Sequence, residues 1–284
     1  MKLIADSGST KCDWMMVGDG ENRIAKTMGF NPFFHTQSFI QTKLIENNEL
    51  SVFKNDIEEI YYYGAGCSSS ERNEILKSAL ASVFTKAQII EVSEDLDGAA
   101  YATCGQEKGI VCILGTGSNS CYFDGKQVHS RIPALGYVLG DEGSGSYFGK
   151  YLLSQFLYDT MPSHLSNKLQ EKYNIDKESI LHNIYNRPNA NVYLASFMKF
   201  ASENKTDPWL KLMIHNGLST FAKIHILSHP EFKSVPVHFV GSIAYYFNDT
   251  LQILGQELGF TVATTIKKPI EALVAYHMHS QVKV

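Results

Sequence analysis

The chain has 284 residues, of which 44% are hydrophobic and 19% are charged, and its formal net charge is −4. This composition is typical of a globular protein long enough for two domains, each with its own core. Lysines and arginines are scattered rather than clustered, so the sequence does not favour nucleic-acid binding, and its apolar runs are too short to span a membrane.

The cysteines indicate a reducing compartment. There are five of them, an odd number, and no two have Cys-x-x-Cys spacing. This pattern disfavours both a disulfide framework and a zinc site. Free thiols, and an N-terminus that enters a strand without a signal-peptide pattern, predict a cytoplasmic protein.

Apolar strands and helices alternate along the first third of the chain. Glycine, asparagine and proline in residues 29–32 interrupt the early strands. From hydrophobic periodicity we expect strands at residues 2–5, Lys11–Val17, Arg23–Met28, 57–63 and 88–92, and helices at residues 37–49 and 70–84.

The rest of the chain is richer in helices. We expect a strand at Gly109–Leu114, a helical stretch from residue 143 to about 229, a strand at 235–240 and a closing helix at Ile270–His279. This interleaving predicts an α/β fold. The change of pattern predicts a first domain of residues 1–107 and a second of residues 108–284 with a helical insertion. The closing helix is expected to pack back on the first domain.

One short pattern occurs twice between strands. Residues 7–10 read SGST and residues 116–119 read TGSN, and each follows an apolar strand and precedes another. Such repetition suggests duplicated halves. Glycine lets backbone approach a ligand closely, and the N–H groups of a tight turn bind anions. Ordinary hairpin turns have a similar composition, but two matching copies favour phosphate binding.

Acidic residues accompany these turns. Asp6 ends the first strand, and a carboxylate beside phosphates is favourable when Mg²⁺ lies between them. A second acidic stretch, residues 92–102 (VSEDLDGAAYA), begins a helix at the end of a strand, where ligands bind in α/β proteins. There Asp97 is either functional or a helix N-cap, and Glu94 and Asp95 compete with it for both roles.

Two further glycine motifs occur later in the chain. Residues 136–145 (GYVLGDEGSG) surround Asp141 and Glu142 with glycines, which is more typical of a ligand loop than of a spacer. Gly241 and Ser242 lie between a strand and a helix, a weaker signal for a nucleotide-contacting turn.

Together these motifs resemble the actin-like ATPase fold shared by sugar kinases and actin. The pair GTGSN (residues 115–119) and GDEGS (residues 140–144) is similar to the N-acetylglucosamine kinase and BadF/BadG/BcrA/BcrD-type ATPase family. The resemblance extends from Asp6 to the closing helix. It implies two actin-like (ribonuclease H-like) domains with a cleft between them, and a homodimer.

The resemblance also implies roles for individual residues. ATP and Mg²⁺ are expected as cofactors, with Asp6 serving the metal and Asp97 accepting a proton from the attacking sugar hydroxyl. The implied ATP-binding residues are Asp6, Gly8, Ser9, Thr10, Lys11, Thr116 and Gly117 for the phosphates, and Gly241 and Ser242 for the adenosine. The implied sugar-contacting residues are Asn31, Ser118, Asn119, Gly136 and Asp141.

The expected activity is phosphorylation of the 6-hydroxyl of N-acetylglucosamine or a close amino sugar. One alternative on the same fold is an ATP-driven activator of the dehydratase activase type, which requires cysteines exposed at an interface for an iron–sulfur cluster. Another is a sugar sensor without catalysis, which is disfavoured because the phosphate-binding residues are present.

Overall fold

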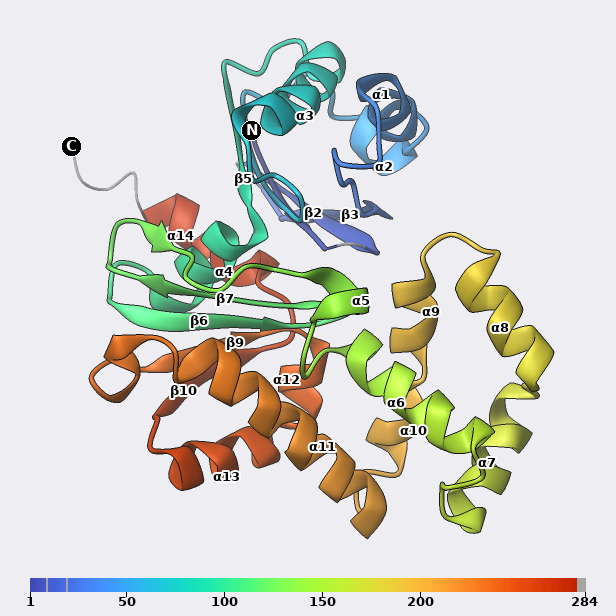
Figure 1. Cartoon of the computed structure of the whole chain (residues 1–284). Coiled ribbons are helices and arrows are strands. Elements are labelled where there is room, and N and C mark those ends of the chain that lie inside the picture. The colour runs from blue at the N-terminus through green and yellow to red at the C-terminus, as the bar shows by residue number, and fades with distance from the viewer. Residues whose placement is uncertain (9, 19, 280–284) are drawn as a thin grey trace. The chain divides into compact units, whose positions relative to one another are not determined.

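The computed structural model describes residues 1–8, 10–18 and 20–279 (Figure 1). The chain forms two compact units. Unit 1 contains residues 1–107, 123–128 and the segment from 268 onward, and unit 2 contains residues 108–122 and 129–267. The closing helix, α14 (Ile270–His279), thus belongs to the same unit as the N-terminal strands.

Unit 1 is built on a five-stranded mixed sheet in the order β3-β2-β1-β4-β5. The strands are β1 (Lys2–Ser7), β2 (Lys11–Val17), β3 (Arg23–Met28), β4 (Glu59–Gly64) and β5 (Ile89–Glu94). Strands β1 to β3 form an antiparallel meander, whereas β4 and β5 run parallel to β1. Ser7 is in register with Gly64, and Gly64 with Glu94. The carboxyl ends of β1, β4 and β5 therefore meet at one edge.

Helices cover both faces of this sheet because side chains alternate along each strand. Trp14 and Tyr62 belong to the core beside α1 (Gln37–Ile45), α2 (Asn48–Ser51) and α3 (Ser70–Val83). Ile4 and Tyr63 point to the opposite core, where α14 packs on β1, β2 and α4 (Asp95–Cys104). In Figure 1 these two helix layers lie on opposite sides of the sheet.

A second five-stranded sheet, in the order β10-β9-β6-β7-β8, belongs to unit 2 except for Phe123 and Val128, which are counted with unit 1. Its strands are β6 (Gly109–Leu114), β7 (Ser118–Phe123), β8 (Val128–His129), β9 (Val237–Val240) and β10 (Val262–Ile266). Strand β9 runs parallel to both β6 and β10. The parallel strands are almost continuously apolar, as expected for strands buried on both faces.

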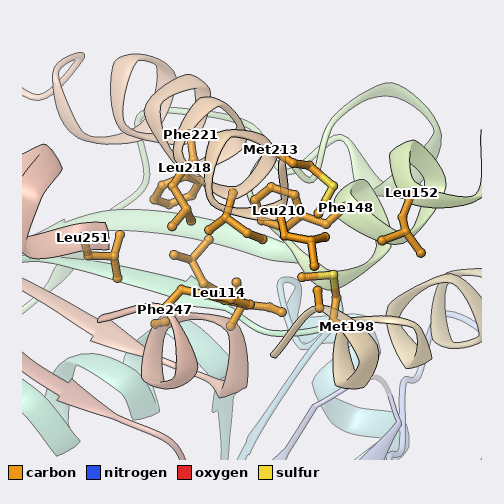
Figure 2. Packing of buried hydrophobic residues seen from close by; sticks show 14 of the residues in the cluster. Leu114, Phe148, Leu152, Met198, Leu210, Met213, Leu218, Phe221, Phe247 and Leu251 are labelled. Atoms are coloured by element: carbon orange, nitrogen blue, oxygen red, sulfur yellow. The ribbon is translucent and has the colours of Figure 1, made fainter. Parts of the chain in front are cut away.

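The helices of unit 2 surround this sheet and extend beyond it. They are α5 (Gly136–Leu139), α6 (Gly145–Leu157), α7 (Ser163–Tyr173), α8 (Lys177–Tyr185), α9 (Ala190–Ser196), α10 (Met198–Glu203), α11 (Pro208–Phe221), the π-helical turn η1 (Ala222–Ile226), the 3-10 turn η2 (Pro230–Lys233), α12 (Ser242–Tyr246) and α13 (Asn248–Leu258). Side chains from β6, α6 and α11, including Leu114, Phe148 and Leu218, meet in the core (Figure 2).

The α/β fold class is confirmed, but several element bounds differ from those expected, and strand β10 was not expected. The helix expected at residues 37–49 is two helices, because the Asn47 side chain accepts a hydrogen bond from the Leu50 N–H and caps a new helix. Strand β5 continues to Glu94, two residues beyond the expected end. No helix of the described residues has the length and hydropathy needed to cross a membrane.

Candidate functional site

The first glycine turn connects β1 to β2 in unit 1. Ser7, the last residue of β1, is fully buried, and its hydroxyl accepts a hydrogen bond from the Phe30 N–H at 3.1 Å. Its carbonyl accepts from the Ala65 N–H at 3.0 Å. These bonds fix the strand end, while Gly8 and Lys11 are exposed and Thr10 is half-buried. Ser9 lies outside the described residues.

Carboxylates crowd the same strand end. Burial, followed by the charges of Asp95 and Asp13, raises the pKa of Asp6 to about 7. Burial, followed by the charge of Glu94, raises the pKa of Asp95 to about 6. Lys268 forms an ion pair with Asp13 at 2.7 Å and opposes part of the shift at Asp6. The arrangement favours a cation beside Asp6 and Asp95.

This donor set suits Mg²⁺. The part of the chain that the structure describes contains no group of three or more histidine, cysteine or acidic side chains placed to hold a metal. Mg²⁺ usually binds to one or two carboxylates and takes its other ligands from water and substrate phosphates. Asp6 and Asp95, oxygen donors with unfavourable mutual charge, fit that mode of binding.

The three acids at the start of α4 have different surroundings. Glu94 is the N-cap, and the Asp97 side chain accepts a hydrogen bond from the Glu94 N–H at 3.2 Å, which completes a capping box. Asp97 therefore occupies the helix-capping position. Asp95 is the first residue of the helix, and it lies close enough to Asp6 for its charge to raise the pKa of that side chain.

Asn31 lies in the turn that follows β3. Its side-chain oxygen accepts a hydrogen bond from the Phe33 N–H at 2.9 Å. A Cβ atom on Gly66 would lie 2.2 Å from that oxygen, so the loop after β4 approaches Asn31 as only glycine allows. Since Gly64 ends β4 beside Ser7, Asn31 lies near the same edge of the sheet as the first turn.

The second glycine turn lies in unit 2 and is held by α6. The Gly115 N–H donates to the Gly117 carbonyl at 3.0 Å, which closes the turn. The first two residues of α6, Gly145 and Ser146, donate their N–H groups to the carbonyls of Gly115 and Thr116 at 2.8 and 3.0 Å. The backbone of this turn is therefore fixed before any ligand binds.

Asp141 points toward this second turn. Its backbone is left-handed, with φ of 56°, and its carboxylate accepts a hydrogen bond from the Ser118 N–H at 3.2 Å. A Cβ atom on Gly117 would come within 2.9 Å of the same carboxylate. The Ser118 hydroxyl is buried and has no hydrogen-bond partner among the described residues. A buried hydroxyl without a partner beside a carboxylate is suited to a polar ligand.

The other predicted sugar-contacting residues of unit 2 are less closely joined to Asp141. The Asn119 side chain accepts a hydrogen bond from the Ser120 N–H at 2.9 Å, which ties it to its own strand. Gly136 begins α5 with φ of 70° and accepts from the Gly140 N–H at 2.8 Å. It is thus connected to the loop that carries Asp141 through the backbone.

Gly241 directly follows β9 and lies close to β6. Its φ is 120°, and a Cβ atom there would lie 2.4 Å from the Leu114 carbonyl oxygen. Its N–H donates to the Ile266 carbonyl at 2.9 Å, and Ser242 begins α12. Leu114 precedes the second turn, so Gly241 and that turn lie side by side within unit 2.

No role was predicted from the sequence for three side chains that meet close to this turn. The His225 ring lies between the Ser120 hydroxyl and the Glu142 carboxylate. Glu142 belongs to a glycine motif, so the sequence holds a signal for it. His225 follows an ordinary apolar helix pattern, and its local sequence holds none.

Comparisons with known proteins identify a related family and the fold of the chain. No protein-family model matches the chain, and no curated protein matches it. A solved structure from Porphyromonas gingivalis, described as a candidate N-acetylglucosamine kinase, is 35% identical, with coverage of 99% of this chain and 100% of that one and a TM-score of 0.94.

Two more distant structures share the fold. A candidate N-acetylglucosamine kinase from Chromobacterium violaceum is 14% identical, with a TM-score of 0.69 and coverage of 97% of this chain and 98% of that one. A ROK family glucokinase from Streptomyces griseus, solved with glucose and AMPPNP, is 15% identical, with a TM-score of 0.55 and coverage of 96% and 97%.

Proposed function

This chain belongs to the N-acetylglucosamine kinase family of actin-like sugar kinases, and we propose that it transfers the γ-phosphoryl group of ATP to the 6-hydroxyl of N-acetylglucosamine or a close amino sugar. The observation that carries this proposal is the fixed second turn, with Asp141 and the unpartnered Ser118 hydroxyl beside it. Family membership supports the kinase chemistry. The Asp141 carboxylate and the neighbouring Ser118 hydroxyl support an acceptor that is rich in hydroxyl groups.

We assign the phosphates of ATP to the two glycine turns. The exposed backbone at Gly8 and the exposed Lys11 are available in unit 1, with Thr10 beside them. In unit 2, Thr116 and Gly117 lie in a turn whose backbone is already fixed, because the Thr116 carbonyl accepts from α6 and the Gly117 carbonyl accepts from the Gly115 N–H. Gly241 and Ser242 are assigned to the adenosine, because Gly241 lies beside the strand that enters the second turn. Asn31 and Asp141 are assigned to the sugar.

The chain's contribution to phosphoryl transfer is positioning and charge. Such transfer passes through a loose transition state that needs little covalent assistance. Asp6 holds a carboxylate where a cation is favoured, and Mg²⁺ bound with ATP would neutralise charge that develops on the phosphoryl oxygens. A second carboxylate accepts the proton of the attacking hydroxyl, which contributes about 10²–10⁴-fold in rate.

Two residues are candidates for this base. The family resemblance implies this role for Asp97, whose side chain belongs to a capping box at the start of α4. Asp95 is buried and interacts electrostatically with Asp6, the proposed metal residue. A base must reach the acceptor hydroxyl, and a carboxylate that caps its own helix is less free to do so. We therefore favour Asp95 and keep Asp97 as the alternative.

The dehydratase activator is the weaker proposal. An iron–sulfur cluster shared between subunits needs cysteines that reach an interface, and all five cysteines of this chain are buried. A cytoplasmic homodimer remains the expected form of the kinase.

A coupled ADP-release assay with Mg-ATP and a panel of amino sugars tests the proposal. We expect turnover that depends on N-acetylglucosamine or a close analogue. Asp95→Asn should lower kcat by about 10²–10⁴-fold. Asp97→Asn keeps an oxygen able to cap the helix, and its kcat should remain within about threefold of the unmodified protein.

The two variants distinguish the possible bases. Loss of kcat in Asp97→Asn with near-normal activity in Asp95→Asn would return the role to Asp97. Absence of sugar-dependent turnover across the whole panel would contradict the kinase assignment itself.

A further inference from the structure

The loop of residues 140–143, here called the acid loop, contacts other parts of unit 2 at three points. Asp141 accepts a hydrogen bond from the Ser118 N–H at 3.2 Å. The next residue, Glu142, has a side chain 21% exposed, and its Oε2 atom lies 3.6 Å from Nε2 of His225. Gly143 packs on Phe221, where a Cβ atom would lie 2.9 Å from the Phe221 Cβ.

His225 is itself held on three sides. Its ring is 3% exposed and stacks on Phe221, with centroids 4.6 Å apart and an interplanar angle of 15°. Its Nδ1 atom lies 3.0 Å from the hydroxyl of Ser120, which is fully buried. Ser120 lies on β7, two residues after Ser118, so the two serines share a face of the strand.

The helix that carries His225 is distorted at that residue. Helix α11 continues into the π-helical turn η1, which contains His225. A π-helical turn accommodates an extra residue and changes the direction of the side chains that follow, and such turns are frequent at functional sites. The distortion thus aims a buried imidazole at the acid loop.

The surroundings specify one form of the imidazole. Burial lowers the pKa of His225, which favours the neutral ring, and the Glu142 charge acts in the opposite direction. With a carboxylate at Nε2, the neutral ring places its N–H on Nε2 and directs it toward Glu142. The Ser120 hydroxyl then donates to Nδ1. This chain of contacts runs from β7 through His225 to the acid loop.

We propose that His225 is a positioning residue for sugar binding, which orients Glu142 so that the acid loop presents two carboxylates, Asp141 and Glu142, to neighbouring hydroxyls of the acceptor. The proposal rests on the function proposed above and deepens it, since it assigns a second sugar contact and names what holds that contact in place. The acceptor it implies is a pyranose with two adjacent free hydroxyls. A carboxylate fixed before binding loses less conformational entropy when the sugar arrives.

The test compares His225→Phe with His229→Phe. Both histidines are buried, at 3% and 2% exposed, and they lie four residues apart, but Ser120 and Glu142 contact His225. We expect His225→Phe to raise the KM for the sugar at least tenfold and to leave the KM for ATP within about twofold. His229→Phe should leave both within about twofold.

A double-mutant cycle separates positioning from general damage. Glu142→Gln should raise the KM for the sugar to a similar extent. The double variant of Glu142→Gln and His225→Phe should have a KM for the sugar no higher than that of the more impaired single variant, because both changes remove the same contact. His225→Gln keeps an N–H that can reach Glu142 and should recover part of the loss. Multiplying effects in the double variant would overturn the proposal.

Hydrogen exchange gives a readout that does not depend on kinase activity. Amides of residues 140–143 should exchange at least tenfold faster in His225→Phe than in the unmodified protein, and should be unchanged in His229→Phe. Unchanged exchange in His225→Phe would overturn the positioning role even if no sugar proves to be a substrate. Absence of turnover in the unmodified protein, with faster exchange in His225→Phe, would instead contradict the proposed function.

Discussion

Asp6 is the second-last residue of strand β1, and its carboxylate lies beside Asp95 and Asp13. Burial and like charges both oppose ionisation, so this residue destabilises the ligand-free protein at neutral pH. Proteins retain such arrangements at sites where a ligand removes the conflict. The proposed role of Asp6 at Mg²⁺ explains why an acid occupies this position.

Asp6→Asn should stabilise the protein in the absence of Mg²⁺. The pKa of Asp6 is about 7 in the folded protein, against an ordinary value of 3.8, so between these values the folded state binds the proton more tightly. The free energy of unfolding contributed by this group therefore falls as pH rises through that window. At pH 8 in EDTA we expect the variant to be more stable by about 3–4 kcal/mol, and near pH 4 the difference should fall below about 1 kcal/mol.

Urea unfolding followed by tryptophan fluorescence measures this difference. Trp14 is buried in unit 1 and Trp209 lies in unit 2, so a Trp209→Phe background reports on the unit that contains Asp6. Glu21→Gln is the control, because it removes an exposed carboxylate of the same unit. A variant at Asp6 that is no more stable than its parent at pH 8 would contradict this account.

At the scale of elements, α6 both supports the second turn and packs unusually closely on α9. A Cβ atom on Gly145 would lie 2.9 Å from the Ala195 Cβ, and one on Gly149 would lie 1.9 Å from the Leu194 carbonyl oxygen. The two glycines are four residues apart and lie on one face of the helix. Because backbone meets backbone there, the contact has no room to adjust.

Gly149→Ala should therefore destabilise unit 2 by about 2–4 kcal/mol, although the same change in an exposed helix is usually stabilising by about 1 kcal/mol. Thermal unfolding followed by circular dichroism measures it. Gly259→Ala is the control, since its φ of 79° is strained for alanine but its Cβ meets nothing within 4 Å, and it should cost about 1 kcal/mol. An equal cost for both variants would show that the α6–α9 contact is softer than described.

Element ends also decide how far the sequence can predict the site. The two glycine turns are predicted as ligand sites because their residue types are restricted by chemistry, and Asp141 because glycines surround it. The roles of the acids at α4 depend on where β5 ends. Ending that strand at residue 92 leaves Asp97 as the functional acid, whereas its continuation to Glu94 makes Asp97 the capping residue and puts Asp95 next to Asp6. A two-residue shift is beyond what hydrophobic periodicity can specify.

His225 shows a different limit of sequence reasoning. It approaches Glu142 because α11 continues into a π-helical turn, and no residue type in that segment requires the turn. Its contacts join residues 120, 142 and 225, which are distant in sequence. Such a contact comes from packing of the whole unit.

At the scale of the whole molecule, unit 1 is assembled from segments at both ends of the chain. Helix α14 returns to cover the face formed by Ile4, Met15 and Tyr63. His277 is buried there, 8% exposed, with Nε2 2.8 Å from the Tyr63 hydroxyl and its ring stacked on Tyr61. The attachment of the C-terminal helix thus includes a titratable group.

The stability of unit 1 should decrease in mild acid because of His277. Burial, and then the charge of Lys2, lowers its pKa from 6.5 to about 4. Between these values the unfolded chain binds a proton that the folded protein does not. The stabilising contribution of His277 to the free energy of unfolding is therefore complete above about pH 6.5 and is lost as pH falls toward 4. Between pH 7 and pH 5 we expect a loss of about 1–2 kcal/mol from this residue.

His277→Gln retains a hydrogen-bonding group for Tyr63 but does not titrate, so it should be less sensitive to this pH change than the parent. Unfolding in the Trp209→Phe background measures the difference, and the exposed His182→Gln is the control. Identical pH dependence in His277→Gln and the parent would show that His277 does not couple proton binding to folding.

Identification of the reaction product decides whether this chain is the proposed kinase. The protein is incubated with Mg-ATP and N-acetylglucosamine, and the product is examined by mass spectrometry and by phosphorus–proton correlated NMR. We predict a sugar monophosphate whose phosphorus couples to the two protons on C6, formed together with an equal amount of ADP. ADP accompanied only by free phosphate, or phosphate attached at another position of the sugar, would contradict the proposed function.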